Sequence, residues 1–276
     1  MENINFFIEK SKQLRLEIFK KFCQTRQGHP GSIYSMLDLI VGLYYGNYLN
    51  LNDEKNEFEE KIIISKGHAT SALYPILVEK NIIKQKEWDN WGVNEDSILR
   101  IFGNTNIPGI DAASGSLGHG IGIGAGYAYS FKERGLDTKV FVIISEGELY
   151  EGSIWESLLF VNHYNLTNLH IIIDRNNLMI LGDTEDCLKL EPINKKIESF
   201  GFKTKTIDGH NFNEILKAYD IFFQNQNDQC NCIIANTTKG KGISNFENKA
   251  KWHYWNNLSN KEEQEIIREL DGISKR

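Results

Sequence analysis

The chain has 276 residues, of which 41% are hydrophobic and 25% charged, and this composition excludes wholesale disorder. Its formal net charge of −6 argues against a nucleic-acid partner, which requires a basic face. The longest apolar run, residues 140–144, is far too short to span a bilayer. The N-terminus shows no secretory signal, and the four cysteines form neither a disulfide framework nor a zinc pattern, so we expect a cytoplasmic protein.

Apolar periodicity divides the chain into helical segments and buried strands. Helices are expected over residues 6–25, 32–45 and 154–164. Continuous β-branched runs predict central strands at residues 139–144, 169–174 and 231–236. Strands joined by helices indicate an α/β fold, a doubly wound parallel sheet with helices on both faces. We expect a single domain over residues 1–276, with a C-terminal extension from about residue 245.

Polar clusters follow two of these strands directly, at the sheet edge where ligands of such folds bind. The first runs from Ser145 to Gly152 and contains three acids and two glycines, and the second runs from Asp174 to Leu178. Gly147 would let backbone N–H groups approach an anion. Carboxylate and amide oxygens suit a hard divalent cation, although either cluster alone is more often a solvated loop.

Two histidines lie in glycine-flanked turns before helical patterns, in Gly28-His29-Pro30-Gly31 and Ser65-Lys66-Gly67-His68. A neutral imidazole there can donate to a phosphate or hydroxyl oxygen, although a lone histidine more often packs or caps. The glycine-rich residues 115–124 follow no credible strand. A nicotinamide-dependent dehydrogenase is therefore disfavoured, and close backbone approach is the better explanation of these glycines.

Taken together and in register, these motifs resemble the N-terminal, pyrophosphate-binding portion of transketolase, as found in split transketolases. The likeness covers almost the whole chain. It rests on residues 28–31 with Ser35 and Asp38, 65–69 with Leu73-Tyr74, 114–118, Glu146-Gly147-Glu148 with Glu151-Gly152 and Trp155-Glu156, 174–178, and 238–242.

The resemblance implies a thiamine diphosphate enzyme in which a divalent ion, normally Mg²⁺, bridges the diphosphate to the protein. It places the metal ligands at Glu146, Asn176 and the Leu178 carbonyl. The implied cofactor-binding residues are His68, Gly115, Ser116, Leu117, Gly147, Glu148, Asn176 and Leu178. The implied catalytic residues are His29, His68, Glu151 and His253, and Trp252-His253-Tyr254 leaves the last register open by one residue. Glu151 and Glu156 match carboxylates at the family's subunit interface.

Three positions depart from the family pattern. Glu146 replaces an aspartate and is longer by one methylene, so Ca²⁺ or Mn²⁺ is an alternative ion. Asn104 stands where the family has a histidine that meets the donor sugar, which makes a changed donor plausible. His119 replaces a glutamine, and we expect no role for it beyond an interface or ring contact.

The resemblance implies an N-terminal subunit that transfers a two-carbon ketol unit between sugars or sugar phosphates. Its partner would be the C-terminal, pyrimidine-binding subunit, with two copies of each chain in the assembly. One alternative is a specialised sugar-biosynthetic ketol transferase with an altered donor. Another is a non-catalytic cofactor-binding or regulatory subunit.

Overall fold

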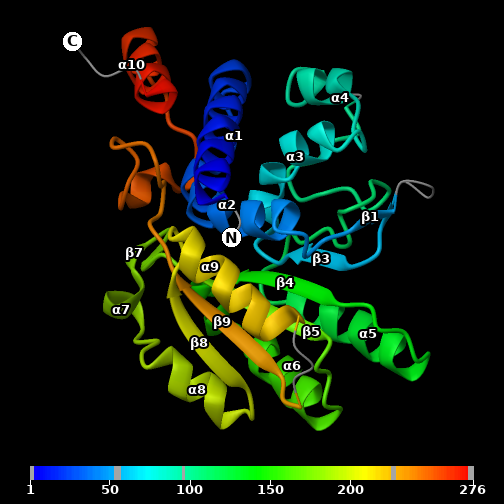
Figure 1. Cartoon of the computed structure of the whole chain (residues 1–276). Helices are drawn as coiled ribbons and strands as arrows, with labels where there is room; N and C mark the ends of the chain where they lie inside the picture. The colour runs from blue at the N-terminus through cyan, green and yellow to red at the C-terminus, as the bar shows by residue number, and fades with distance from the viewer. Residues whose placement is uncertain (1–2, 53–56, 95–96, 225–227, 273–276) are drawn as a thin grey trace.

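The computed structural model describes residues 3–52, 57–94, 97–224 and 228–272. At its centre is a parallel sheet of five strands in the order β3-β4-β5-β9-β8 (Figure 1). The strands are β3 (Lys61–Ile64), β4 (Val140–Ser145), β5 (Leu169–Arg175), β8 (Lys203–Asp208) and β9 (Asn231–Asn236). Two small antiparallel pairs lie outside this sheet, β1 (Leu51–Asn52) with β2 (Glu57–Phe58) and β6 (Leu178–Met179) with β7 (Gly182–Asp183).

Helices cover both faces of the sheet because its central strands are apolar on both sides. In β4, Phe141 and Ile143 belong to one core, while Val142 and Ile144 belong to the other, as the twofold alternation of a strand requires. The first core includes residues of α1 (Ile4–Thr25), α2 (Pro30–Tyr45), α3 (Tyr74–Glu79), α4 (Gln85–Asn90) and α9 (Phe212–Tyr219). The second includes residues of α5 (Gly120–Glu133), α6 (Gly152–His163) and α8 (Ile193–Ser199).

The remaining helical segments are short, apart from the last. They are η1 (Gly67–Ala72), η2 (Glu146–Tyr150), α7 (Thr184–Cys187), η3 (Asp220–Gln224), η4 (Ala250–His253) and α10 (Asn260–Asp271). Figure 1 shows α10 beside α1, and Ile266 and Leu270 of α10 join the first core. The segment expected to form a C-terminal extension therefore shares the core of α1 and α2.

The predicted fold class is confirmed, as are the three predicted strands and the three predicted helices, within a few residues at their ends. Strands β3 and β8 are additions to that prediction. β8 reads Lys-Thr-Lys-Thr-Ile-Asp, and most of its side chains are exposed, as is common in an edge strand. Such a strand gives no apolar signal in the sequence.

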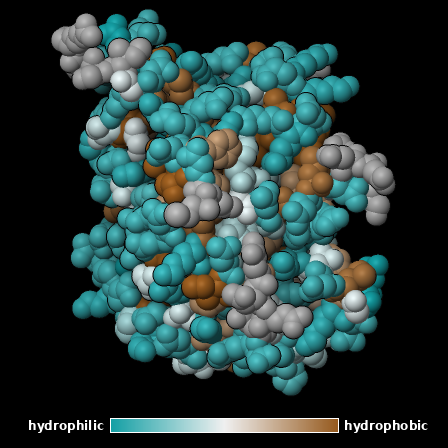
Figure 2. Space-filling view, in the orientation of Figure 1, coloured by the Kyte–Doolittle hydropathy of each residue, from teal (hydrophilic) through white to brown (hydrophobic). Residues whose placement is uncertain are grey.

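The described part of the chain has no helix that is long and apolar enough to cross a membrane. The face shown in Figure 2 is mostly hydrophilic, with apolar residues in small groups. All four cysteines carry free thiols, and Cys230 and Cys232 are buried. The cytoplasmic location stays a prediction.

Gly67, the first residue of η1, packs directly against the backbone of Ser114. A Cβ atom at Gly67 would lie 1.8 Å from the carbonyl oxygen of Ser114, whereas one at Gly126 on α5 would meet nothing within 4 Å. We expect Gly67→Ala to lower the free energy of unfolding by about 1–3 kcal/mol through overpacking. The control, Gly126→Ala, should be neutral or raise it by up to about 1 kcal/mol, because alanine favours helix. Urea unfolding of both variants measures this, and equal stabilities would contradict the contact.

Candidate active site

A cavity of about 620 Å³ lies at the carboxyl ends of the sheet, where ligands of doubly wound folds bind. The segments that follow four neighbouring strands, β3, β4, β5 and β9, all contribute to its wall. The lining residues are His29, Ser32, Lys66, His68, Ile101, Phe102, Gly115, Leu117, Ser145, Glu146, Gly147, Tyr150, Glu151, Asn176, Leu178, Met179, Ile180, Lys239, His253 and Tyr254. Ten of the twelve predicted site residues are in this set, and Ser116 and Glu148 are not.

A buried ion pair joins the loops beneath the cavity. Lys66 and Asp174 are 1% and 0% exposed, and the Lys66 ammonium contacts the Asp174 carboxylate. Asp174 also accepts hydrogen bonds from Ser35 Oγ, at 2.5 Å, and from Thr237 Oγ1. Lys66 Nζ donates in addition to the Ser32 carbonyl, at 2.7 Å. One network therefore connects α2, the turn after β3, the end of β5 and the loop after β9.

Three histidines from separate segments meet in the cavity. The ring centroids of His29 and His68 are 4.9 Å apart, and His253 lies 5.8 Å from the first and 5.4 Å from the second. Burial, with nearby Lys239, lowers the pKa of His29 to about 4 and that of His253 to about 3. Burial also places the pKa of His68 well below its ordinary value. All three rings are therefore neutral at pH 7, and His253 supplies the third imidazole of the cluster.

Lys239 is a cavity residue that the sequence analysis did not single out, although it lies in the matched segment 238–242. It is 2% exposed, and its ammonium is 3.3 Å from the Leu178 carbonyl oxygen and 3.4 Å from His253 Nδ1. Burial, with Lys66 nearby, lowers its pKa to about 8, so it stays largely protonated at pH 7. The N-terminus of α2 begins beside it, because a Cβ atom at Gly31 would lie 3.0 Å from Lys239 Cγ. A buried ammonium near a helix N-terminus suits an anionic ligand.

The predicted metal ligands lie together at the ends of β4 and β5. Glu146 is 1% exposed; its Oε2 contacts Arg175, and its Oε1 is buried without a hydrogen-bond partner. Asn176 Oδ1 accepts from the Leu178 amide at 3.2 Å, and both residues line the cavity. Burial raises the pKa of Glu146 to about 6, against the opposing effect of Arg175.

These donors are a carboxylate, a side-chain amide and a backbone carbonyl, the oxygen types that Mg²⁺ and Ca²⁺ accept. The orphaned Glu146 Oε1 offers a buried oxygen that a cation would satisfy. The described residues contain no group of three or more His, Cys, Asp or Glu side chains that could hold a metal ion. A metal here would therefore depend on the amide and carbonyl oxygens as well.

Glu148 has a different surrounding from the one expected of a cofactor ligand. It is 0% exposed, and its carboxylate accepts from Ser65 Oγ, from the Gly118 amide at 3.1 Å and from the Ser145 amide at 2.7 Å. Its oxygens are therefore engaged inside the protein, where they fasten the glycine-rich segment to the ends of β3 and β4. Ser116 is exposed and lies outside the cavity lining.

The structure also shows where Asn104 and His119, two of the residues that depart from the family pattern, lie relative to the cavity. Asn104 lies outside the cavity lining, and its side chain donates to the Ile98 carbonyl at 2.9 Å and accepts from the Asn106 amide at 3.1 Å. Both polar ends of the Asn104 side chain are thus engaged within its own loop. Ile101 and Phe102 of the same loop line the cavity instead. His119 is exposed at the N-cap of α5.

Neutral buried histidines make stability depend on pH in a defined direction. The folded-state pKa values of His29 and His253 lie below the ordinary value of 6.5, so their contribution is complete above pH 6.5 and is lost as the pH falls toward about 4. We expect the urea midpoint to fall between pH 7 and pH 5, and His29→Gln to make this fall shallower. His163→Gln, at an exposed position on α6, is the control. An unchanged slope for His29→Gln would contradict the assignment.

Comparisons with known proteins show which family the chain matches. Residues 8–272 match the transketolase thiamine diphosphate binding domain. The chain is 34% identical to an apulose-4-phosphate transketolase subunit of Phocaeicola vulgatus over 256 residues, which cover 92% of this chain and 89% of that protein. It is 31% identical to transketolase of Homo sapiens over 250 residues, which cover 89% of this chain and 39% of that protein.

Solved structures show the same fold. Transketolase from Campylobacter jejuni aligns with a TM-score of 0.81 and 23% identity, covering 98% of this chain and 46% of that one. The chain therefore spans less than half the length of that transketolase, but most of the length of the Phocaeicola vulgatus protein. The chain belongs to the transketolase family, and residues 8–272 correspond to its thiamine diphosphate binding domain.

Proposed function

We propose that this chain is the diphosphate-holding subunit of a two-subunit transketolase, which transfers a two-carbon ketol unit between sugars or sugar phosphates. The observation that carries the proposal is the single cavity that combines neutral histidines, a buried lysine and the orphaned carboxylate oxygen of Glu146. The relatives from Phocaeicola vulgatus and Actinobacillus succinogenes, each named as one subunit of a transketolase, support the two-subunit assembly.

Bound thiamine diphosphate supplies the carbon chemistry, and the protein holds and orients it. Glu146, Asn176 and the Leu178 carbonyl would hold a divalent ion, for which we propose Mg²⁺, against the diphosphate. Gly147 lines the cavity between strand β4 and helix α6, where its backbone N–H can serve the same anion. Gly115 and Leu117, on the opposite loop, would border the cofactor's rings. These roles are consistent with the positions of all six residues in the wall.

The neutral histidines can transfer protons to and from a substrate bound in the cavity. His68 Nε2 lies 3.0 Å from Ser32 Oγ, and His29 Nδ1 is buried without a hydrogen-bond partner. A neutral imidazole can both donate and accept, so His29, His68 and His253 can hold sugar hydroxyls and move a proton. Such groups contribute typically about 10²–10⁴ in rate. A purely regulatory subunit has no need of this cluster.

The partner would dock beside Glu151, which lies at the cavity wall and is exposed. Next to it, Gly122 and Gly126 of α5 and Glu156 and Phe160 of α6 line a shallow surface cavity of about 350 Å³. Small residues there allow another chain to approach closely. We propose that the pyrimidine-binding subunit covers this surface, with two copies of each chain, and that Glu151 meets the carboxylate that activates the cofactor in the assembly.

A ketol transferase with an altered donor is the second candidate. Ile101 and Phe102 line the cavity while Asn104 is held within its own loop, so this part of the wall is apolar where the family places a histidine. Relatives at 34% and 35% identity are named for apulose 4-phosphate. These two observations favour a donor other than the usual ketose phosphates for this chain.

An assay of ketol transfer before and after the two subunits are mixed tests the two-subunit proposal. The purified chain should show no ketol transfer alone and should become active when a pyrimidine-binding transketolase subunit is added. We propose that Glu151 relays a proton to the activating carboxylate, so Glu151→Gln should lower the activity of the mixture, because a neutral amide cannot relay a proton. Glu133→Gln, at an exposed position at the end of α5, is the matched control and should retain full activity. Full activity of the lone chain would refute the proposal.

A further inference from the structure

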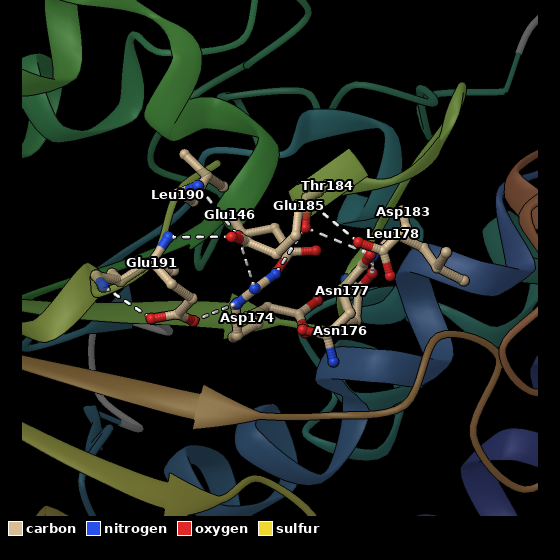
Figure 3. Close-up of polar contacts among 12 residues, drawn as sticks. Glu146, Asp174, Asn176, Asn177, Leu178, Asp183, Thr184, Glu185, Leu190 and Glu191 are labelled. Atoms are coloured by element: carbon tan, nitrogen blue, oxygen red, sulfur yellow. Dashed lines mark hydrogen bonds and ion pairs between the residues drawn. The ribbon is translucent and has the colours of Figure 1, made fainter. Parts of the chain in front are cut away.

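Arg175 lies directly before Asn176, one of the three proposed metal ligands, and contacts a second, Glu146. It is 3% exposed at the end of β5. Its Nη1 contacts Glu146 Oε2 and donates to Thr184 Oγ1 at 2.7 Å. Its Nη2 lies 3.1 Å from Glu185 and its Nε 3.2 Å from Glu191. Figure 3 shows Glu146 and Glu185 close together, with Glu191 on one side of them and Asn176 and Leu178 on the other.

The guanidinium group of Arg175 is held in place by residues other than the proposed metal ligands. Glu185 also accepts from the Leu190 amide at 3.0 Å, and Glu191 accepts from the Ile193 amide at 2.9 Å. Both acids are thus held by the backbone near α8, and each in turn holds one side of Arg175. A planar guanidinium with all three nitrogens engaged has a defined orientation, which a flexible ammonium would lack.

This orientation of Arg175 gives the two carboxylate oxygens of Glu146 different surroundings. Oε2 is taken by Arg175, whereas Oε1 is buried and has no hydrogen-bond partner. Glutamate is longer than the aspartate of the family pattern, and a free glutamate could bind a cation through both oxygens. Because Arg175 occupies Oε2, Glu146 has only Oε1 left to bind a cation.

The number of oxygens offered decides between hard divalent ions. Ca²⁺ takes six to eight oxygens and accepts bidentate carboxylates, whereas Mg²⁺ requires near-ideal octahedral geometry with short bonds. We propose that Arg175 is a positioning residue that makes Glu146 a one-oxygen ligand and thereby makes the site prefer Mg²⁺ over Ca²⁺. This inference rests on the proposed function, because it presupposes the divalent ion at Glu146, Asn176 and Leu178.

The test measures ion preference rather than turnover. The full chain, at a fixed concentration of thiamine diphosphate, is titrated calorimetrically with MgCl₂ and with CaCl₂, and the ratio of the two apparent dissociation constants is recorded. We expect the parent to bind Mg²⁺ more tightly. Arg175→Gln should shift the ratio toward Ca²⁺ by about tenfold, which is the size of change in metal affinity that the loss of a residue orienting a metal ligand causes.

Two further variants serve as a second test of Arg175 and as a control for the ion-preference measurement. Arg175→Lys retains the charge without the planar guanidinium, so it should also shift the ratio of dissociation constants toward Ca²⁺. If circular dichroism shows that Arg175→Gln does not fold, the ratio measured for Arg175→Lys tests the role of Arg175. Arg134→Gln, at an exposed position after α5, is the matched control and should keep the parent ratio. A parent ratio in folded Arg175→Gln or Arg175→Lys would overturn the inference.

Asn176→Ala separates this inference from the proposed function. If the metal site is correct, this variant should weaken cofactor-linked binding of both ions. Weakened binding in Asn176→Ala together with an unchanged ratio in the Arg175 variants would refute only the role of Arg175. Parent-like binding of both ions by Asn176→Ala would refute the metal site itself, and the inference with it.

Discussion

The buried ion pair between Lys66 and Asp174 is the interaction on which the architecture of the site depends. Removing a charge from water costs several kcal/mol unless a partner and hydrogen bonds replace the solvent, so each group fixes the other. Ser35 and Thr237 complete the coordination of the Asp174 carboxylate, and the Ser32 carbonyl accepts from Lys66. The loops that carry His68, Asn176 and Lys239, and the start of α2, are therefore held together by one polar network beneath the cavity.

The charge distribution of the cavity follows from that pairing. Lys66 is neutralised by Asp174, whereas Lys239 contacts a carbonyl and His253, so its positive charge is available to a ligand. This charge also disfavours protonation of His29 and His253, which burial already opposes. The result is a wall that combines a cation for an anionic ligand with uncharged groups for hydroxyls. A diphosphate at one end and a sugar at the other match these two properties.

The sequence predicts the parts of this arrangement that depend on local pattern. Strands β4, β5 and β9 are continuous apolar runs, and Glu146 and Asn176 follow two of them directly, so their proximity follows from parallel pairing. Strand β8 escaped prediction because its polar, exposed edge resembles a loop. Lys239 was recognised only as part of a motif, since its burial against His253 depends on tertiary packing.

Side-chain direction was the hardest feature to predict. Glu146 and Glu148 differ by two positions in one loop, yet the first reaches the cavity and the second turns inward to Ser65 and Gly118. No composition or spacing distinguishes them. The same holds for Arg175, whose partners Glu185, in the short helix α7, and Glu191, after that helix, both lie beyond the β6–β7 hairpin. Only the folded chain shows which carboxylate is left for a ligand.

The central claim is that this chain grips the diphosphate end of the cofactor through a divalent ion. The most direct test is calorimetric titration of the full chain with thiamine diphosphate and with unphosphorylated thiamine, each with MgCl₂ and with a chelator. The account predicts heat of binding for thiamine diphosphate with metal, a large loss of affinity in chelator, and no measurable binding of thiamine under either condition. Equal binding of thiamine and thiamine diphosphate, or binding that is indifferent to the chelator, would contradict it.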